Sequence, residues 1–521
     1  MLMHDFLDFY AREQPGAEFL VLDDRVLNYS QALEDVNRLS NAMVASGLGV
    51  GDRFAFLSKN SIETVITYLA ASRCGAVPVP LNWRLAPPEW AYIINDAGAV
   101  QLIAESEFSS TIDKIRDDLP AVTRYVSIGK QDSERWIDFE GWWGDYSAKA
   151  PEIEIDADDV LYQMYTSGTT GRPKGAMLTQ RCVIENGLQT TPYFKDVVGP
   201  GKRSLIVMPM FHAGATSFVF GTLIGGASMV IHRDFSPAAV AKALSEGEIS
   251  VANLVPAMIQ AMLEYVPDLA DSSYEMLDVM IYGASSIAED TLRRAMKVFQ
   301  CDFYQGFGQT ETSACVTMLS AADHRRALAG RPELLLSAGR ALLGTTIRIV
   351  DDDGNEVPRG SSGEIVARGP QLMKGYWNLP EATAKTLVDG WIHTGDVGVM
   401  DDEGYVYIKD RIKDMVVSGG ENVYPREIEN VLFDHPAVAD AAVIGVPDEK
   451  FGEAVLAVLV LRAGESVEPD TLIAFCREKL AGYKVPRRIE FVDELPRNAS
   501  GKVLKKDLRK PYWEGRTRNV G

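Results

Sequence analysis

Residues 165–175 combine side chains and backbone suited to binding phosphate. They read Tyr-Thr-Ser-Gly-Thr-Thr-Gly-Arg-Pro-Lys-Gly, with three glycines, four serine or threonine hydroxyls and one lysine. Glycine backbone can turn its N–H groups toward an anion, and the hydroxyls and Lys174 add further donors. The spacing is not that of a Walker A loop, because Lys174 stands three residues after Gly171 and is followed by glycine. The composition predicts a phosphate-binding loop, with a solvated flexible loop as the alternative.

Two further segments carry residue types suited to a nucleotide. The apolar run at residues 277–282 precedes Gly, Ala and Ser at 283–285, and such small residues would let the backbone lie flat against a planar base. Thr310 and Glu311 follow a second glycine-containing run, at residues 305–309. Taken alone, the Thr-Glu pair is more typical of a helix cap. The companion segments decide between these interpretations.

The elements that must position these segments change in type along the chain. From about residue 17, short β-rich runs alternate with helical patterns, which predicts layered α/β structure with mainly parallel strands. Near residue 340 the pattern becomes short β segments separated by turn signals, which predicts a β-rich subdomain. The last part of the chain has its own helices and strands and predicts a separate α+β domain of about a hundred residues. We expect an α/β fold with domains at residues 1–411 and 412–521.

Length, composition and charge narrow the class of protein. A chain of 521 residues exceeds what one hydrophobic core usually serves, so at least two domains are expected. Hydrophobic residues at 46% and charged residues at 24% are ordinary for a soluble globular protein. The net charge of −21 argues against a nucleic-acid partner, which would require a dominant basic surface. A polyanionic ligand would therefore need positive groups gathered locally.

Cysteine usage and the first residues predict a cytoplasmic protein. The five cysteines are odd in number and form no Cys-x-x-Cys pair, so they are expected to be reduced thiols. Residues 1–16 mix acidic and apolar side chains without a basic start or a continuous apolar core, which favours an amphipathic helix over a signal peptide. No apolar run reaches membrane-spanning length, so no transmembrane segment is expected.

At residues 165–175 the sequence resembles the adenylate-forming superfamily of acyl-CoA synthetases, firefly luciferase-type enzymes and peptide-synthetase adenylation domains. The resemblance continues in order through six further motifs over essentially the whole chain, at residues 282–285, 305–311, 394–396, 410–414, 419–425 and 498–502. It implies an AMP-binding large domain, a mobile C-terminal domain, and the use of ATP and Mg²⁺ to activate a carboxylic acid.

The implied reaction sets the roles of the site residues. A carboxylate oxygen attacks the α-phosphorus of ATP and pyrophosphate leaves, so the site must offset repulsion between anions. By resemblance, Thr310 donates to the α-phosphate, Glu311 is the Mg²⁺ ligand, and Asp396 and Arg411 hold the ribose. The resemblance assigns the β- and γ-phosphates to Thr166, Ser167, Gly168, Thr169, Thr170 and Lys174, and the adenine platform to Gly283, Ala284 and Ser285, with Gln305, Gly306 and Phe307 also in the nucleotide site.

The C-terminal domain supplies the catalytic lysine in this resemblance. Lys502, in the run Asn-Ala-Ser-Gly-Lys, would stabilise charge between the carboxylate and the α-phosphate, and its alternative is one more lysine in a basic tail. Lys413 holds the hinge position about which the family rotates this domain between its two half-reactions. Gly419 and Gly420 would then approach the pantetheine of coenzyme A, where the lack of side chains permits close contact.

The acyl group is expected to be hydrophobic. Residues 207–215 resemble the family's acyl-pocket entrance, with His212 as the gating aromatic, and a plain core or loop histidine is the alternative. Further pocket walls are expected from Tyr282, Gly306, Gly308, Thr312 and Cys315. No acidic residue in these segments is placed to hold an α-amino group. Fatty and aryl acids both stay open, because one methylene changes binding by only ~1–3 kcal/mol. Val417 stands where plant coumarate ligases carry lysine, which weakens the cinnamate option.

The acceptor of the acyl group is expected to be coenzyme A, since no carrier segment with a phosphopantetheine serine follows the C-terminal domain. An acyl-AMP ligase that loads a separate carrier protein is the first alternative, and a luciferase-like oxidase shares the motifs. A nucleotide-binding regulator without turnover is disfavoured by the joint presence of Lys502, Glu311 and Lys174. The sequence leaves open the particular acid, a homodimer, the pathway and peripheral membrane association.

Overall fold

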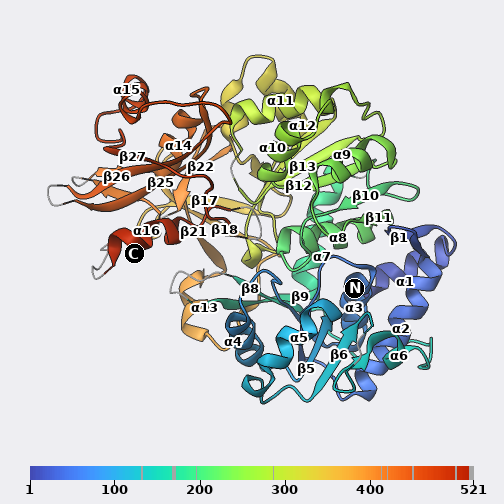
Figure 1. Cartoon of the computed structure of the whole chain (residues 1–521). Helices are drawn as coiled ribbons and strands as arrows, with labels where there is room; N and C mark the ends of the chain where they lie inside the picture. The colour runs from blue at the N-terminus through green and yellow to red at the C-terminus, as the bar shows by residue number, and fades with distance from the viewer. Residues whose placement is uncertain are drawn as a thin grey trace.

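The computed structural model describes residues 1–130, 133–166, 172–194, 196–285, 287–411, 414–418, 421–448, 451–498 and 502–514, with the side chains of 411, 421 and 422 left out. Figure 1 shows the C-terminal elements, orange to red, on the opposite side of the molecule from the N-terminal helices. The predicted mixed α/β fold, with a large multi-sheet N-terminal part and a smaller C-terminal part, is confirmed.

The largest sheet runs through the middle of the N-terminal part. Its strand order is β16 (Arg340–Ala341), β15 (Thr317–Leu319), β14 (Asp302–Phe307), β13 (Val279–Gly283), β12 (Val251–Leu254), β10 (Arg203–Ile206), β11 (Ser228–Ile231), β1 (Glu18–Leu22) and β2 (Arg25–Asn28). The strands from β14 to β1 pair in parallel, and the edge strands pair antiparallel. Parallel strands covered by helices carry apolar runs, as β12 and β13 do. The carboxyl ends of β13 and β14 therefore lie together at one edge.

Helices cover this sheet and link its strands. They are α1 (Met3–Glu13), α2 (Tyr29–Ala45), α7 (Gln180–Phe194), α8 (Ala213–Gly225), α9 (Pro237–Glu246), α10 (Pro256–Tyr265), α11 (Glu289–Phe299) and α12 (Ala321–Leu328), with the short helices η2 (Leu269–Asp271), η3 (Thr310–Thr312) and η4 (Pro332–Leu336). The predicted amphipathic helix at the start is α1, which buries Met3, Leu7 and Ala11. Within the described ranges, no helix is both long and apolar enough to span a membrane.

A second parallel sheet is built from the early β–α alternation. It contains β4 (Val77–Pro80), β3 (Arg53–Leu57), β5 (Gln101–Glu105), β6 (Arg124–Ile128) and β7 (Ile137–Asp138), with α3 (Ile62–Cys74), α4 (Pro87–Ala97), α5 (Ser106–Lys114), α6 (Phe139–Trp143) and η1 (Arg116–Asp118). A small antiparallel sheet of β8 (Val160–Thr166), β9 (Lys174–Thr179) and β19 (Gly375–Tyr376) packs beside it. In the hairpin β8–β9, Thr166 pairs with Lys174, so this sheet fixes both ends of the predicted phosphate loop.

The predicted β-rich subdomain is an antiparallel sheet. It contains β17 (Thr346–Val350), β18 (Ser362–Arg368), β20 (Leu387–Val388), β21 (Trp391–Met400) and β22 (Val406–Arg411), with α13 (Pro380–Thr386) before β20. Alternate strand residues such as Ile365 and Ile392 are fully buried in its core. In β21 and β22, Asp396 lies opposite Arg411, so the two expected ribose-binding positions are brought together by strand pairing.

The C-terminal part forms its own sheet and core. The sheet holds β24 (Glu421–Val423), β23 (Val416–Ser418), β26 (Gly452–Leu461), β25 (Val438–Asp448) and β27 (Arg488–Phe491), flanked by α14 (Pro425–Phe433), α15 (Pro469–Lys479) and α16 (Lys505–Trp513). Val443, Leu459, Leu472 and Cys476 are fully buried within it. The boundary after residue 411 stays a prediction, and Lys413 lies outside the described residues.

Candidate active site

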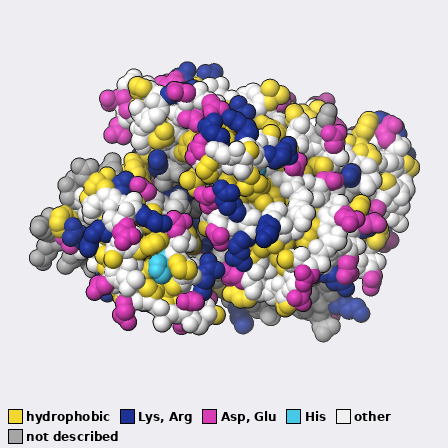
Figure 2. Space-filling view, turned by 90° about the horizontal axis from the view of Figure 1, so that it is seen from above, with side chains coloured by type: hydrophobic (Ala, Val, Ile, Leu, Met, Phe, Trp, Pro, Cys, Tyr) yellow, Lys and Arg dark blue, Asp and Glu magenta, His cyan; other side chains and the backbone are white. Residues whose placement is uncertain are grey.

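A cavity of about 230 Å³ lies where the large sheet, the β-rich sheet and the C-terminal part meet. Among the residues assigned from sequence, its wall contains Ala284, Ser285, Gln305, Gly306, Phe307, Asp396 and Lys502. Its wall carries charges of both signs, namely the basic residues Arg294, Arg426, Arg462, Arg497, Lys502 and Lys505 and the acidic residues Glu264, Asp290, Asp396, Asp410, Asp414, Glu429 and Asp440. Seen from above, Lys and Arg side chains also concentrate along the middle of one face of this acidic protein (Figure 2). We call this space the nucleotide cavity.

Backbone forms one wall of the nucleotide cavity. Gly283 at the end of β13 lies opposite Gly306 of β14, and a Cβ on Gly283 would lie 2.5 Å from the Gly306 carbonyl oxygen. Ala284 follows in the left-handed region, with φ of 64°. Since even a methyl group at Gly283 would clash, the two strands approach closely and present flat backbone at their ends. This geometry suits the predicted adenine platform.

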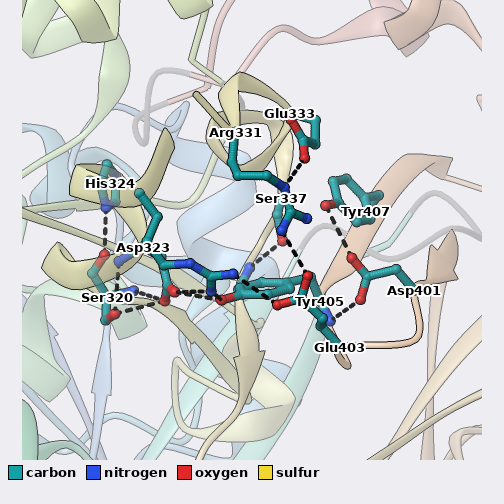
Figure 3. A network of polar contacts seen from close by, with 12 residues as sticks. Ser320, Asp323, His324, Arg331, Glu333, Ser337, Asp401, Glu403, Tyr405 and Tyr407 are labelled. Carbon is teal, nitrogen blue, oxygen red and sulfur yellow. Dashed lines mark hydrogen bonds and ion pairs between the residues drawn. The ribbon is translucent and has the colours of Figure 1, made fainter. Parts of the chain in front are cut away.

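A polar network links β13 to α12, and Figure 3 shows its His324–Ser320 and Asp323–Tyr405 contacts. The Tyr282 hydroxyl lies 2.9 Å from His324 Nε2, and His324 Nδ1 lies 2.8 Å from the Ser320 carbonyl oxygen. Burial lowers the pKa of His324, so its ring is neutral at neutral pH. On the same helix, Asp323 accepts a hydrogen bond of 2.5 Å from Tyr405 of the β-rich sheet. The network therefore ties β13 to the neighbouring subdomain.

The network also corrects an expectation from sequence. Tyr282 was expected to line the acyl pocket, but its ring is fully buried against His324 on the other face of β13. Successive strand residues point to opposite faces, and the preceding residue, Ile281, lines a separate cavity between α7, α8 and the large sheet. Tyr282 supports the strand rather than forming a pocket wall.

The predicted phosphate and metal residues meet beside the nucleotide cavity, at Tyr376. The Tyr376 hydroxyl donates to Glu311 Oε1 at 2.7 Å, and the Thr166 hydroxyl donates to the same oxygen at 3.4 Å. Lys174 Nζ lies 5.0 Å from the centroid of the Tyr376 ring. Strand β19 places Tyr376 by pairing with β9. Sequence reasoning missed Tyr376, because the tyrosine stands outside every motif recognised.

Glu311 has the chemistry of a magnesium ligand. Its carboxylate is buried, with 8% of the residue exposed, and it is positioned by η3 and by the Tyr376 hydroxyl. The described residues hold no group of three or more His, Cys, Asp or Glu that would enclose a metal ion. Mg²⁺ typically takes one or two carboxylates together with phosphate oxygens and water, so a single Glu fits an ion that is carried by ATP.

The charge of Lys502, in the C-terminal part, acts on His212 of the large domain. His212 caps α8, where its Nδ1 accepts a hydrogen bond of 3.3 Å from the Gly214 N–H. Burial, and then the positive charge of Lys502, lower the pKa of His212 to about 4. The imidazole is therefore neutral at physiological pH. Lys502 also lines the nucleotide cavity together with Ser285 and Gly306 of the large domain.

Buried ion pairs hold the C-terminal part in this position. Lys505 Nζ lies 2.8 Å from Glu429 and 3.9 Å from Asp410, which precedes the predicted hinge. The backbone N–H of Arg426 donates to the Asp410 carboxylate at 3.0 Å. Burial opposes the charge of Lys505, but Asp410 and Glu429 outweigh it and raise the pKa of this ammonium. The cluster joins chain segments on both sides of residues 412–413.

A second, smaller cavity of about 90 Å³ lies inside the large domain, between α7, α8 and the large sheet. Its lining residues are Asn186, Gly187, Thr190, Thr191, Phe194, Val198, Ser217, Phe218, Gly221, Thr222, Gly225, Asn253, Ile281, Cys315 and Met318. We call it the acyl cavity. Cys315 of this wall lies against Gly306 of the nucleotide cavity, because a Cβ on Gly306 would lie 2.7 Å from the Cys315 sulfur.

The acyl cavity departs from the walls expected from sequence. Of those residues only Cys315 lines it, whereas Gly306 and Gly308 line the nucleotide cavity and Thr312 is fully buried with its hydroxyl donating to Gln309. The wall residues on α7 and α8 that sequence reasoning did not assign are small or apolar residues typical of any helix interface. No sequence signal distinguishes them from ordinary core positions.

Several assigned residues are not part of these walls. Six of them lie outside the wall of the nucleotide cavity, namely Thr166, Lys174, His212, Gly283, Thr310 and Glu311. The assignments for Ser167, Gly168, Thr169, Thr170, Lys413, Gly419 and Gly420 fall outside the described residues, as does the Arg411 side chain.

Comparison with known proteins identifies the family. The profile described as AMP-binding enzyme matches residues 7–377, and that of the AMP-binding enzyme C-terminal domain matches residues 427–502. The chain therefore belongs to the AMP-binding enzymes of the adenylate-forming superfamily, as its resemblance predicts.

Full-length relatives agree with this assignment. The fatty acid–[acyl-carrier-protein] ligase ScoC of Streptomyces coeruleorubidus is 37% identical, over 98% of this chain and 96% of that protein. Feruloyl-CoA synthase of Amycolatopsis sp is 38% identical, over 96% of this chain and 97% of that protein. The solved structure of ATP-bound MatB from Rhodopseudomonas palustris matches with a TM-score of 0.89 and 31% identity, over 98% of this chain and 99% of that one.

Proposed function

We propose that this protein is an AMP-forming acyl-CoA ligase that activates a hydrophobic carboxylic acid with ATP and transfers the acyl group to coenzyme A. One observation carries the proposal. Lys502 of the C-terminal part lines the nucleotide cavity together with Ser285 and Gly306 of the large domain, and its charge acts on His212 at the start of α8. Since α8 then runs along the acyl cavity, a cation stands where acid and nucleotide would meet.

In the first half-reaction, a carboxylate oxygen bonds to the α-phosphorus while the bond to the departing pyrophosphate breaks. Lys502 would stabilise the negative charge that develops between carboxylate and α-phosphate, and Thr310 would donate to the same phosphate. Thr166 and Lys174 would hold the outer phosphates, and Glu311 would hold the accompanying Mg²⁺, which neutralises charge on the leaving group. The neutral imidazole of His212 would close the entrance of the acyl pocket without adding a second positive charge beside Lys502.

The second half-reaction requires a thiol to reach the adenylate. We propose that the C-terminal part rotates about Lys413, which breaks the ion pairs of Lys505 with Asp410 and withdraws Lys502. A hinge of a few residues suffices for such a rotation. Gly419 and Gly420 would then border the path of the pantetheine arm.

The acid class follows from the acyl cavity. Among the described residues, its lining includes no Asp, Glu, Lys or Arg, so these residues offer no partner to a charged tail. Glycines at 187, 221 and 225 make room between α7 and α8 instead. A fatty or aryl acid fits this wall better than an amino acid.

The two leading candidate functions differ in the molecule that accepts the acyl group. One relative is named for a carrier protein and another for coenzyme A. The test incubates the enzyme with ATP, Mg²⁺ and a fatty-acid mixture, and adds coenzyme A, a phosphopantetheinylated carrier protein or neither. Mass spectrometry of the products should show acyl-CoA with multiple turnovers, and only enzyme-bound acyl-AMP without a thiol. Acylation of the carrier alone would replace the proposal by an acyl-AMP ligase that loads a carrier.

A further inference from the structure

Helix α4 contacts both strands that carry the outer phosphate-binding positions Thr166 and Lys174. Thr166 ends β8, Lys174 begins β9, and the two residues pair. On α4, Tyr92 and Asp96 stand four residues apart, which places their side chains on one face of the helix. That face bonds the residue next to Thr166 on one side and the residue next to Lys174 on the other.

Asp96 holds the residue that precedes Thr166. The Tyr165 hydroxyl donates to Asp96 Oδ2 at 2.6 Å, and Gln163 Nε2 donates to the Tyr165 oxygen at 3.2 Å. Hydrogen bonds that end on a carboxylate are shorter and stronger than those between neutral groups. The Tyr165 side chain is therefore held by both its donor and its acceptor, and it fixes the backbone that presents Thr166.

Tyr92 holds the residue that precedes Lys174. Its hydroxyl donates to the Pro173 carbonyl oxygen at 3.2 Å. On the other side of Lys174, Gly175 lies against Tyr165, since a Cβ on Gly175 would lie 3.0 Å from Tyr165 Cζ. The backbone on both sides of Lys174 is therefore packed against the same group of side chains.

The same helix also supports β19, which places Tyr376 beside the expected magnesium ligand. The indole N–H of Trp377, the residue after Tyr376, donates to the Asp96 carbonyl oxygen at 3.0 Å. The Arg53 guanidinium lies 3.4 Å from the centroid of the Trp377 ring, and Arg53 Nε donates to Gln163 Oε1 at 3.3 Å. These contacts join the small sheet of β8, β9 and β19 to α4 at one place.

The chemistry of these contacts favours a role in orientation over simple packing. Hydrogen bonds depend on angle as well as distance, so each one fixes the direction of its strand end. Apolar side chains would fill the same space without this constraint. Orientation matters for phosphate binding, because a displacement of about 1 Å at a binding group can lower a rate by about 10².

Building on the proposed function, we propose that Asp96 and Tyr92 of α4 are positioning residues for the β- and γ-phosphates of ATP. Asp96 acts through Tyr165 on Thr166, and Tyr92 acts through Pro173 on Lys174. Neither residue is expected to touch the nucleotide.

The experiment compares the dissociation constants of MgATP and AMP, measured by titration calorimetry without any acid. AMP lacks the two outer phosphates, so its binding does not require Thr166 or Lys174. Tyr165→Phe removes only the hydroxyl that Asp96 accepts, and Asp96→Ala removes the acceptor. Each should weaken MgATP binding by about tenfold and leave AMP binding within about twofold of native, as loss of one hydrogen bond to a carboxylate implies.

Three further variants sharpen the comparison. The double variant Tyr165→Phe/Asp96→Ala should bind MgATP no more weakly than either single variant, because both lose the same bond. Asp96→Asn keeps an acceptor oxygen and should restore most of the affinity that Asp96→Ala loses. Tyr92→Phe should act in the same direction by a smaller factor, since its bond ends on a neutral carbonyl.

The control is Asn95→Ala, at the neighbouring position of α4, whose amide donates to the Asp118 carbonyl oxygen at 2.8 Å. It should change the affinity for neither nucleotide. Equal losses of MgATP and AMP affinity in Tyr165→Phe, or no loss for either, would overturn the inference, whether or not the Asp96 variants fold. A native protein that binds neither nucleotide would instead contradict the proposed function itself.

Discussion

The nucleotide cavity and the acyl cavity are built in opposite ways. The nucleotide cavity draws its wall from the large sheet, the β-rich sheet and the C-terminal part, and it gathers charged groups such as Asp396 and Lys502. The acyl cavity lies within the large domain between two helices and the sheet, and no described residue of its wall carries a charged side chain. They meet at Gly306, whose missing side chain leaves room for Cys315.

We expect the nucleotide cavity to carry out the reaction and the acyl cavity to select the acid. Every adenylation requires the same charges to be offset, so those groups must be of fixed type, and they come from distant segments that only the fold unites. The acyl wall must only match a shape, which many combinations of small and apolar residues achieve. Substitutions in the first cavity should therefore affect all acids alike, whereas substitutions in the second should affect some acids only.

The largest effect is expected from Lys502→Ala. Loss of the cation at the meeting point of acid and nucleotide should lower the adenylation rate by about 10²–10³ for every acid, the range seen when one transition-state donor is removed. Thioester formation from chemically prepared acyl-AMP should stay within a few-fold of native. The matched control is Lys506→Ala at an exposed position nearby. A loss of adenylation rate that differed between acids would contradict the expected difference between the two cavities.

An intermediate effect is expected from filling the acyl cavity at Gly221. A Cβ on Gly221 meets nothing within 4 Å, so Gly221→Ala, Gly221→Val and Gly221→Leu should fold and fill the space stepwise. Each added methylene-sized group should lower kcat/KM for the longest acids by roughly tenfold while short acids are spared. The KM for ATP, measured in the same assays, should not change. An equal loss for acetate and dodecanoate would show that the cavity does not hold the tail.

A smaller effect is expected from Tyr376→Phe. Removing the hydroxyl that positions Glu311 should lower adenylation by about tenfold, in line with one lost hydrogen bond to a carboxylate. The concentration of Mg²⁺ needed for half-maximal activity should rise, for all acids equally. Titration of Mg²⁺ at fixed ATP measures this. An unchanged Mg²⁺ requirement would separate Tyr376 and Glu311 from metal binding.

The smallest effect concerns His212 at the junction of the cavities. Its pKa in the folded protein, about 4, lies below the unfolded value near 6.5, so between these values the unfolded state binds more protons. The contribution of His212 to stability is therefore present above pH 6.5 and is lost as pH falls toward 4. Urea unfolding at pH 7.5 and 5.0 should show a smaller loss of stability for His212→Gln than for native protein. Identical losses would place a protonated imidazole at the junction.

Sequence reasoning located the charged residues better than the apolar ones. Lys502 and Asp396 could be assigned because they stand in motifs that resemble those of the family, and the structure brings both to one wall. The walls on α7 and α8 could not, since Gly221 or Phe218 would look the same in any helix packed on a sheet. Tyr282 was misplaced because the face of a strand depends on its register within the sheet, which local pattern does not set. Tyr376 was missed because its role depends on pairing between β19 and the distant β9.

The most direct test of the account is exchange of labelled pyrophosphate into ATP, measured without any thiol and with a panel of hydrophobic acids. The account predicts exchange that requires both an acid and Mg²⁺, at rates that vary with the length of the acid and fall by about 10²–10³ in Lys502→Ala. Exchange that is absent with every acid, in a folded protein that binds ATP, would contradict it.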